Sequence, residues 1–126
     1  MIAAVQNKPI TIYGDGKQVR DVLFVEDLLN AYDAAVANID QAAGEVFNVG
    51  GGPANTISVW KEFAPILEKK LGKKIPTEIS TWRPGDQKIY VSDISKAKDI
   101  LQWQPEVGVE EGIARLVEWV ESIPSD

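Results

Sequence analysis

The strongest constraint on the fold is that apolar residues switch along the chain between strand-like and helix-like spacing. Ile10 to Tyr13 is a β-branched and aromatic run that predicts a strand, and Gly14-Asp15-Gly16 would end it as a turn. Helical spacing starts at Val25 and predicts a helix with one buried stripe. The residues of this stripe are Val25, Leu28, Leu29, Tyr32, Ala35, Val36 and Ile39.

The middle of the chain repeats this alternation. Val46 to Val49 predicts a buried strand, and the glycines at 50–52 with Pro53 would end it. Thr56 is a plausible N-cap for a second helix that would run to Leu71. Pro65 conflicts with that helix, because an interior proline removes a hydrogen bond and costs about 3 kcal/mol. We therefore expect a kink, or a helix that restarts there.

The last third of the chain completes the pattern. Ile75 to Ser80 predicts a short strand, Ser92 or Asp93 would cap a short helix, and a final helix would begin near Val109. Strands and helices thus alternate throughout, which predicts an α/β fold. With 126 residues, we expect a single domain spanning 1–126, or a piece of one.

Charge and composition exclude several classes of function. The net charge is −6, from 19 acidic and 13 basic residues, which argues against a nucleic-acid or anionic-membrane surface. Cysteine and histidine are both absent, which excludes thiolate metal sites and removes the commonest general base. No apolar run approaches the roughly 18 residues of a membrane span, and no signal-peptide pattern opens the chain. A cytoplasmic location is the expectation.

Two arginines are candidate anion ligands, because each lies where a turn meets a regular element. Arg20 follows the turn after the first strand and stands beside Asp21. Arg83 precedes Pro84 and Gly85, which would form a turn that puts Arg83 and Asp86 on the same side. A guanidinium can hold a diphosphate through two parallel charge-assisted hydrogen bonds. The alternative is that both arginines form surface ion pairs with Asp21 and Asp86, which contribute little.

Two apparent motifs are weaker. Tyr13 and Lys17 have the Tyr-x-x-x-Lys spacing of a dehydrogenase catalytic pair, but the glycines between them make the required helix improbable. The glycines at 50–52 invite a dinucleotide-loop interpretation, yet Asn55 occupies the place of the third glycine in that motif. We favour a plain connecting loop, although a helix N-terminus near Thr56 could still face a ligand. Trp82, beside the arginine turn, is the one tryptophan kept as a possible ligand contact.

In this order, the segments resemble the C-terminal part of the extended short-chain dehydrogenases/reductases, the NAD-dependent nucleotide-sugar epimerases and dehydratases. The similarity covers nearly the whole chain, from about Lys8 to Val120. The motifs that carry it are Ile12 to Asp21 with Val25 to Leu28, Val46 to Gly50, Arg83 to Asp86, and Asp93 to Lys98 with Leu101 to Pro105. Within the family, the runs Gly50 to Trp60 and Trp82 to Gln87 are most similar to the epimerases that act at C2 of CDP-sugars.

The resemblance implies roles for six positions. Arg20 and Arg83 would contact the substrate diphosphate, and Asp86 the ribose hydroxyls. Tyr13 and Gln18 would line the nucleotide pocket, with Ile57 packing near it. In such enzymes NAD takes a hydride from a sugar carbon and returns it to the opposite face.

The family's N-terminal Rossmann region, with its NAD loop and helical Tyr-x-x-x-Lys, has no counterpart in this sequence. We therefore expect an α/β substrate-binding portion with no cofactor of its own, inactive alone, that binds a nucleotide sugar such as a CDP-sugar. The alternative hypothesis is a non-catalytic module kept for self-association. In both cases an exposed sheet edge and apolar face could be covered by a homodimer partner or by a complementary Rossmann chain.

Overall fold

The computed structural model describes residues 1–123 and has the mixed α/β character predicted from the sequence. The chain divides into two compact units. The first unit comprises Met1–Val19, Ile57–Ile89 and the described chain from Glu110 onward, and the second comprises Arg20–Thr56 and Tyr90–Val109. The expectation of a single domain over 1–126 stays a prediction.

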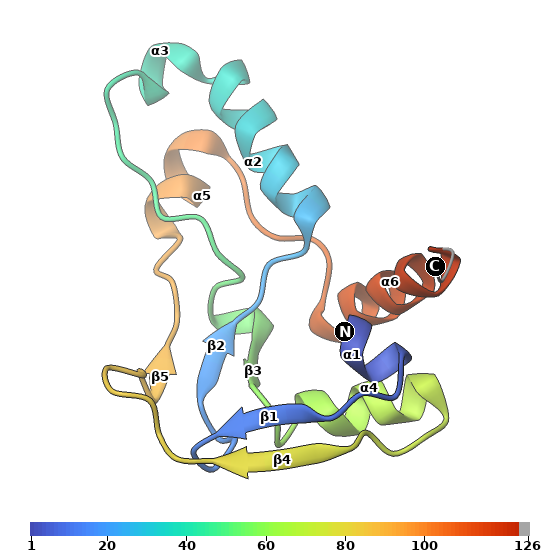
Figure 1. Cartoon of the computed structure of the whole chain (residues 1–126). Helices are drawn as coiled ribbons and strands as arrows, with labels where there is room; N and C mark the ends of the chain where they lie inside the picture. Colours follow the sequence, from blue (N-terminus) through green and yellow to red (C-terminus); the bar gives the residue numbers. More distant parts are fainter. Residues whose placement is uncertain (124–126) are drawn as a thin grey trace. The chain divides into compact units, whose positions relative to one another are not determined.

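A parallel strand pair organises the first unit (Figure 1). Strand β1 (Ile10–Tyr13) pairs with β4 (Thr77–Ser80), and the register places Tyr13 opposite Ser80. The Gly14 amide extends the ladder by donating to the Ser80 carbonyl at 3.0 Å. Both predicted strands are thereby confirmed, and the turns that follow them begin at the same end of the pair.

Three helices complete the first unit: α1 (Ile2–Val5), α4 (Phe63–Leu71) and α6 (Val109–Ser122). The Lys70 ammonium pairs with the Glu118 carboxylate at 2.7 Å, and this ion pair links α4 to α6. Lys73 Nζ donates to the Val5 carbonyl at 2.9 Å. The apolar side chains buried in this unit are Ala4, Ile12, Ile57, Ala64, Leu67, Ile75, Ile113, Val117 and Val120.

The prediction of a helix capped by Thr56 is wrong. Thr56–Ser58 is strand β3, and α4 begins only at Phe63. Between them the Ser58 amide donates to Glu62 Oε2 at 2.7 Å, and the Glu62 amide donates to Ser58 Oγ at 2.9 Å. The later start removes the conflict at Pro65, because a proline in the first turn of a helix removes no helical hydrogen bond.

A second sheet has the strand order β3–β2–β5, with β2 at Val19–Asp21 and β5 at Ile89–Tyr90. The chain passes from one unit to the other within each of these three strands. Neither β2 nor β5 was predicted. Strands of two or three residues are too short to show a periodic pattern.

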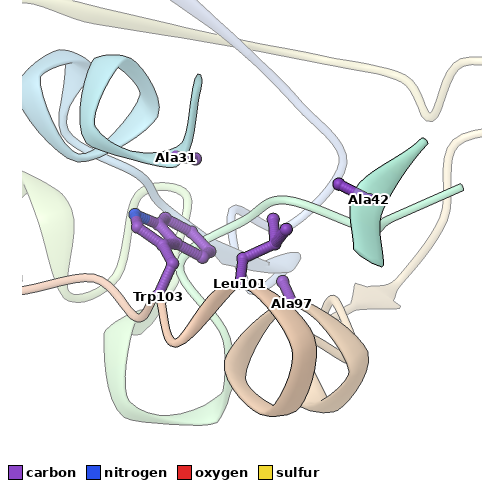
Figure 2. Packing of buried hydrophobic residues seen from close by; sticks show 5 residues of the cluster. All are labelled: Ala31, Ala42, Ala97, Leu101 and Trp103. Atoms are coloured by element: carbon purple, nitrogen blue, oxygen red, sulfur yellow. The ribbon is translucent and has the colours of Figure 1, made fainter. Parts of the chain in front are cut away.

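Helices α2 (Val25–Ala37), α3 (Ile39–Ala42) and α5 (Ser95–Leu101), with the 3₁₀ turn η1 (Pro53–Asn55), form the second unit. Small side chains let the helices approach closely around a single indole ring (Figure 2). The fully packed members of this core are Ala31, Ala42, Ala97, Leu101 and Trp103. The predicted helices at Val25 and after Asp93 are therefore confirmed.

A buried carboxylate holds the loop after α5 against α2. Asp27 is only 1% exposed, and its two oxygens accept from the Glu106 and Val107 amides, each at 3.0 Å. Its backbone carbonyl accepts from the Trp103 indole N–H at 2.9 Å. A buried charge is tolerated when its lone pairs are met by donors in this way.

Two predictions about apolar surface in the second unit are wrong. The helix at α2 forms, but most of the stripe predicted to be buried is exposed, whereas Asp27 and Ala31 are its buried residues. Val46 to Val49 forms no strand, and Val46 is 81% exposed. The spacing of apolar residues correctly predicted the helix at α2, but it wrongly predicted burial for both segments.

No helix in residues 1–123 has the length and apolar character needed to cross a membrane.

Replacing the buried carboxylate tests its role. Asp27→Asn removes the charge and leaves one of the two loop amides facing an N–H group. We expect a loss of about 2–4 kcal/mol in the free energy of unfolding, since a hydrogen bond to a charged group contributes about 1.5–3 kcal/mol. Urea denaturation measures this change. Asp33→Asn, at an exposed position of the same helix, is the matched control and should change stability by less than about 0.5 kcal/mol; equal effects would contradict this role.

Candidate functional site

The turn after β1 shapes one side of a candidate site in the first unit. Gly14 and Gly16 both adopt positive φ, at 77° and 71°. Asp15 Oδ1 accepts from the Lys17 amide at 3.0 Å, which closes the turn. The predicted turn is confirmed, and it leaves Tyr13 with its ring partly exposed at the end of the strand.

The turn after β4 packs directly on this first turn. A Cβ added to Gly14 would stand 2.5 Å from Cε2 of the Trp82 indole, which is closer than any real contact. Only glycine therefore allows the indole to lie on the backbone at this point. The close approach places Trp82 and the residues after it beside Tyr13.

Arg83 is held by an aromatic ring and a carboxylate. Its guanidinium carbon lies 4.7 Å from the centroid of the Tyr13 ring, within the range of a cation–π interaction. Its Nη2 lies 3.5 Å from Asp86 Oδ2, and the Asp86 amide donates to the Arg83 carbonyl at 3.2 Å. The expectation that the turn puts both charges on one side is confirmed. The Arg83 side chain nevertheless stays 61% exposed, so its remaining N–H groups can reach a ligand.

Gln18 presents an unmatched acceptor at the same place. The residue is 5% exposed, and its Nε2 donates to the Tyr13 carbonyl at 2.6 Å. Its Oε1 accepts no hydrogen bond from any residue in 1–123. A buried acceptor without a donor costs about 1–3 kcal/mol, so a donor that reached it would be strongly favoured.

A pocket of about 320 Å³ opens beside these groups, and all of its walls belong to the first unit. Its lining residues are Asp15, Lys17, Gln18, Val19, Trp82, Lys88 and Ile89. Two lysines and one aspartate border it, so its wall is net positive in a protein of net charge −6, and this local charge favours an anion. Lys88 was not predicted, because it follows no motif and reaches the pocket only through the pairing of its carbonyl with the Val19 amide.

The six residues singled out from the sequence divide into three groups. Tyr13, Gln18, Arg83 and Asp86 lie in or beside the two adjoining turns of the first unit, and of these four only Gln18 lines the pocket. Ile57 belongs to the same unit but is buried, and it does not line the pocket. Arg20 belongs to the second unit, as a half-buried residue of β2. That its guanidinium converges with that of Arg83 on one diphosphate stays a prediction.

The structure also decides between the two weaker motifs and their alternatives. Tyr13 ends a strand and Lys17 lies in a turn, so no helix brings them to one face. No helix starts at Thr56 either, which removes the predicted helix terminus at that point.

The space beside the glycines at 50–52 is filled by other residues of the protein. A Cβ on Gly50 would meet Ser92 Oγ at 2.3 Å and Asp21 Oδ2 at 2.6 Å, and one on Gly51 would meet the Val22 carbonyl oxygen at 2.0 Å. Small residues are thus required by internal packing, and the Gly52 amide already donates to the Asp21 carboxylate. The loop does not fit a dinucleotide phosphate, in agreement with its interpretation as a connection.

Hydrogen bonds favour the ionised form of the Asp21 carboxyl group. Partial burial raises the pKa of its carboxyl, but hydrogen bonds from the Gly52 amide and from Ser92 outweigh this, so the pKa lies below its ordinary value of 3.8. The Gly52 amide donates to Oδ2 at 2.9 Å. The carboxylate therefore contributes to the stability of the second unit.

Comparison with known proteins matches residues 1–116 to the family described as GDP-mannose 4,6 dehydratase. The chain is 38% identical to CDP-paratose 2-epimerase from Salmonella typhi over 93% of its length, and 40% identical to UDP-glucuronate 4-epimerase from Thermodesulfobacterium geofontis over 90%. It is also 39% identical to dTDP-glucose 4,6-dehydratase from Xanthomonas campestris. In each case the chain spans about a third of the relative, 34% of its length.

Solved structures show similarity to the same group of enzymes. UDP-glucuronic acid 4-epimerase from Bacillus cereus, in complex with UDP-glucuronic acid and NAD, superposes with a TM-score of 0.85 at 32% identity. UDP-glucose 4-epimerase from Thermotoga maritima, with UDP-glucose, superposes with a TM-score of 0.82 at 30% identity. Both matches cover 95% of this chain and 37% of the other. The match lies in the C-terminal part of these extended short-chain dehydrogenases/reductases, as the sequence predicted.

The contact between Gly14 and Trp82 can be tested with two glycine variants. Gly72 has a similar positive φ of 65° and open space around it, so Gly72→Ala should cost only the left-handed strain of about 1–2 kcal/mol. Gly14→Ala adds the clash with the indole, and we expect a further 1–3 kcal/mol or so. Thermal or urea unfolding measures both. Equal losses would show that the indole does not lie on Gly14.

The hydrogen bonds to Asp21 predict a pH dependence. Because its pKa is lowered in the folded protein, its contribution is fully present above the unfolded value of 3.8 and is lost as pH falls through the lower folded value. At pH 7, Asp21→Asn should be less stable than wild type by about 1–3 kcal/mol. Urea unfolding at pH 7 and at successively lower pH should show this difference shrinking. A difference that is independent of pH would contradict the assignment.

Proposed function

Since the chain belongs to the GDP-mannose 4,6-dehydratase family of extended short-chain dehydrogenases/reductases, we propose that its first unit binds a nucleotide sugar. The chain would be the substrate-binding portion of an NAD-dependent epimerase or dehydratase. The observation that carries the proposal is Arg83, a largely exposed guanidinium fixed on the Tyr13 ring beside a lysine-bordered pocket.

Arg83 is suited to a diphosphate for two reasons. Its stacking on Tyr13 and its contact with Asp86 limit its motion before any ligand arrives, which lowers the entropic cost of binding. The remaining N–H donors form a planar fork that matches phosphate oxygens. A diphosphate would replace the long contact of 3.5 Å between Arg83 and Asp86, and the Asp86 carboxylate would accept from the ribose hydroxyls.

The pocket beside Arg83 would take the base. Trp82 supplies aromatic surface, and Gln18 supplies the buried acceptor that lacks a donor. The Gln18 amide is oriented by its bond to the Tyr13 carbonyl, so the oxygen rather than the nitrogen remains for a ligand. An exocyclic amino group would satisfy it, and a carbonyl at the same position would not.

The Gln18 acceptor that lacks a donor favours CDP over UDP and dTDP as the nucleotide. The relatives named above carry CDP, UDP and dTDP in their names at nearly equal identity, so overall similarity does not discriminate among the three. Cytosine offers an amino group where uracil and thymine offer a carbonyl oxygen. The sequence runs Gly50 to Trp60 and Trp82 to Gln87, which resemble CDP-sugar 2-epimerases, support the same choice.

Arg20 and Ile57 complete the proposal from the sequence resemblance. Arg20 would provide a second guanidinium for the diphosphate, and Ile57 would support the pocket from the interior. This chain would hold and orient the sugar nucleotide. NAD would supply hydride chemistry from a portion of the enzyme that corresponds to the two thirds of the relatives lying outside the match. Alone, the chain would bind substrate without turning it over.

Calorimetric titration tests the proposal. CDP should bind, and Arg83→Ala should weaken it by roughly 10-fold or more, as expected for loss of about 1.5–3 kcal/mol from a hydrogen bond to a charged group. Arg115→Ala is the matched control, because this exposed arginine pairs with Glu111 on α6, away from the pocket residues. It should leave the affinity unchanged.

The choice of base has its own measurement. UDP and dTDP should bind more weakly than CDP by roughly 10-fold, since loss of one hydrogen bond to a buried acceptor costs about 1–3 kcal/mol. Gln18→Met, which keeps the volume and removes the acceptor, should abolish the difference. Binding of no nucleotide, or equal losses in the Arg83 and Arg115 variants, would overturn the proposed function; equal affinity for all three nucleotides would overturn only the choice of CDP.

A further inference from the structure

Strand β4 leaves one edge of the first unit's sheet open. Within the described chain this sheet consists of β1 and β4, so each strand has one edge without a neighbouring strand (Figure 1). On β1 that edge is partly closed, because the Tyr13 carbonyl accepts from Gln18 Nε2 at 2.6 Å. On β4, no group of residues 1–123 outside the strand pair forms a hydrogen bond with Thr77 or Ile79. The outer edge of β4 is therefore free to pair.

The ladder between β1 and β4 shows which backbone groups point outward. Amides of β1 and its following turn donate to the Pro76 carbonyl at 2.9 Å and to the Ser80 carbonyl at 3.0 Å. A strand directs the hydrogen-bonding groups of alternate residues to the same neighbour. Pro76 and Ser80 thus face β1, whereas the N–H and C=O groups of Thr77 and Ile79 point away from it.

The side chains of this edge favour pairing with another strand. Ile79 is 82% exposed, although it lies in register with the buried Ile12. Exposed sheet edges are commonly protected by lysine, proline or a bulge. From Thr77 to Thr81 the only charged residue is Glu78, and the sequence is rich in β-branched residues, which suit a strand. An open edge of this composition is a template for a further strand.

We propose that β4 pairs antiparallel with β4 of a second copy of this chain, about a two-fold axis at Ile79. In this register the two Ile79 residues exchange backbone hydrogen bonds, and Thr77 lies opposite Thr81 of the second copy. Such pairs of β-branched residues stabilise a sheet. Glu78 lies opposite Ser80 of the second copy, so no like charges are directly opposed.

The two registers nearer the start of the strand are excluded. An axis at Glu78 would place two carboxylates directly opposite each other, which is destabilising. An axis at Thr77 would pair Ile79 with Ile75 of the second copy. The Ile75 amide is not available for this, because it already donates to Glu68 Oε1 at 3.1 Å.

Registers nearer the end of the strand are excluded by the turn that follows it. An axis at Ser80 or beyond would require the chain to stay extended through Trp82 and Arg83. The Trp82 indole instead lies on Gly14, and the Arg83 carbonyl accepts from the Asp86 amide within the turn. The edge is thus self-complementary in one register, as an isologous two-fold interface requires, and this selects a second copy as the occupant.

Charge sets the strength of this association. Each copy carries a net charge of −6, and the two Glu78 carboxylates are diagonal neighbours across the axis. Dimerisation should therefore strengthen as added salt screens the repulsion. Glu78→Gln should strengthen it by roughly 2- to 5-fold, measured by sedimentation equilibrium. Unchanged or weaker dimerisation in this variant would contradict the register.

Two matched variants test the edge itself. Ile79→Glu would bring like charges directly opposite each other, and should weaken dimerisation by roughly 10-fold or more. Val46→Glu is the control, because it adds the same charge at a site that is 81% exposed and belongs to the second unit. It should leave dimerisation unchanged, and both variants should keep the melting temperature of the wild type. A chain that is monomeric at about 1 mM, or equal effects of the two variants on dimerisation, would overturn the inference.

Hydrogen exchange locates the contact within the strand. The Thr77 and Ile79 amides should exchange roughly 10-fold or more slowly at protein concentrations where the dimer predominates than in the dilute monomer, because only the dimer pairs them. The Ser80 amide faces β1 and should be protected equally at both concentrations. Exchange at Thr77 and Ile79 that is independent of concentration would contradict pairing at this edge. All of these measurements are made without nucleotide, so their outcome does not depend on the proposed function.

Discussion

The pairing of β1 with β4 is the constraint on which the candidate site depends. Parallel strands start their following turns at the same end, so Gly14 and Trp82 meet because Tyr13 stands opposite Ser80. A one-residue slip would turn every side chain of β4 to the opposite face and remove the indole from the glycine. From this register follow the position of Arg83 over the Tyr13 ring and the wall of the pocket. The residues of the site thus lie in or beside turns, while the pairing of β1 with β4 determines their relative positions.

The sequence predicted those parts of the fold that local chemistry determines. The run at β1, the glycine turn after it, and the turn that brings Arg83 to Asp86 were all predicted from residue types at short range. The start of α4 was misplaced, because Thr56 has the chemistry of a cap, whereas the reciprocal bonds between Ser58 and Glu62 lie further on. Local patterns do not report which of two possible starts the tertiary structure selects.

The errors in the second unit have a different cause. Helical spacing correctly predicted α2, but an apolar stripe does not reveal whether its partner lies in the same unit. Here the buried face uses Ala31 and the carboxylate of Asp27, which no hydrophobic pattern would select, and the larger residues point outward. The segment 46–49 was read as a buried strand for the same reason. Its residues have strand character and lack the neighbours that would bury them.

The most direct test of the central claim is to follow the backbone and side-chain N–H signals of the ¹⁵N-labelled chain by NMR while CDP is added. The account predicts that the Trp82 indole and the Gln18 amide shift together with saturable dependence on CDP, while the Trp103 indole, which donates to Asp27 in the other unit, does not move. Shifts confined to Gly50–Gly52 and their neighbours, or an absence of any saturable shift, would contradict it.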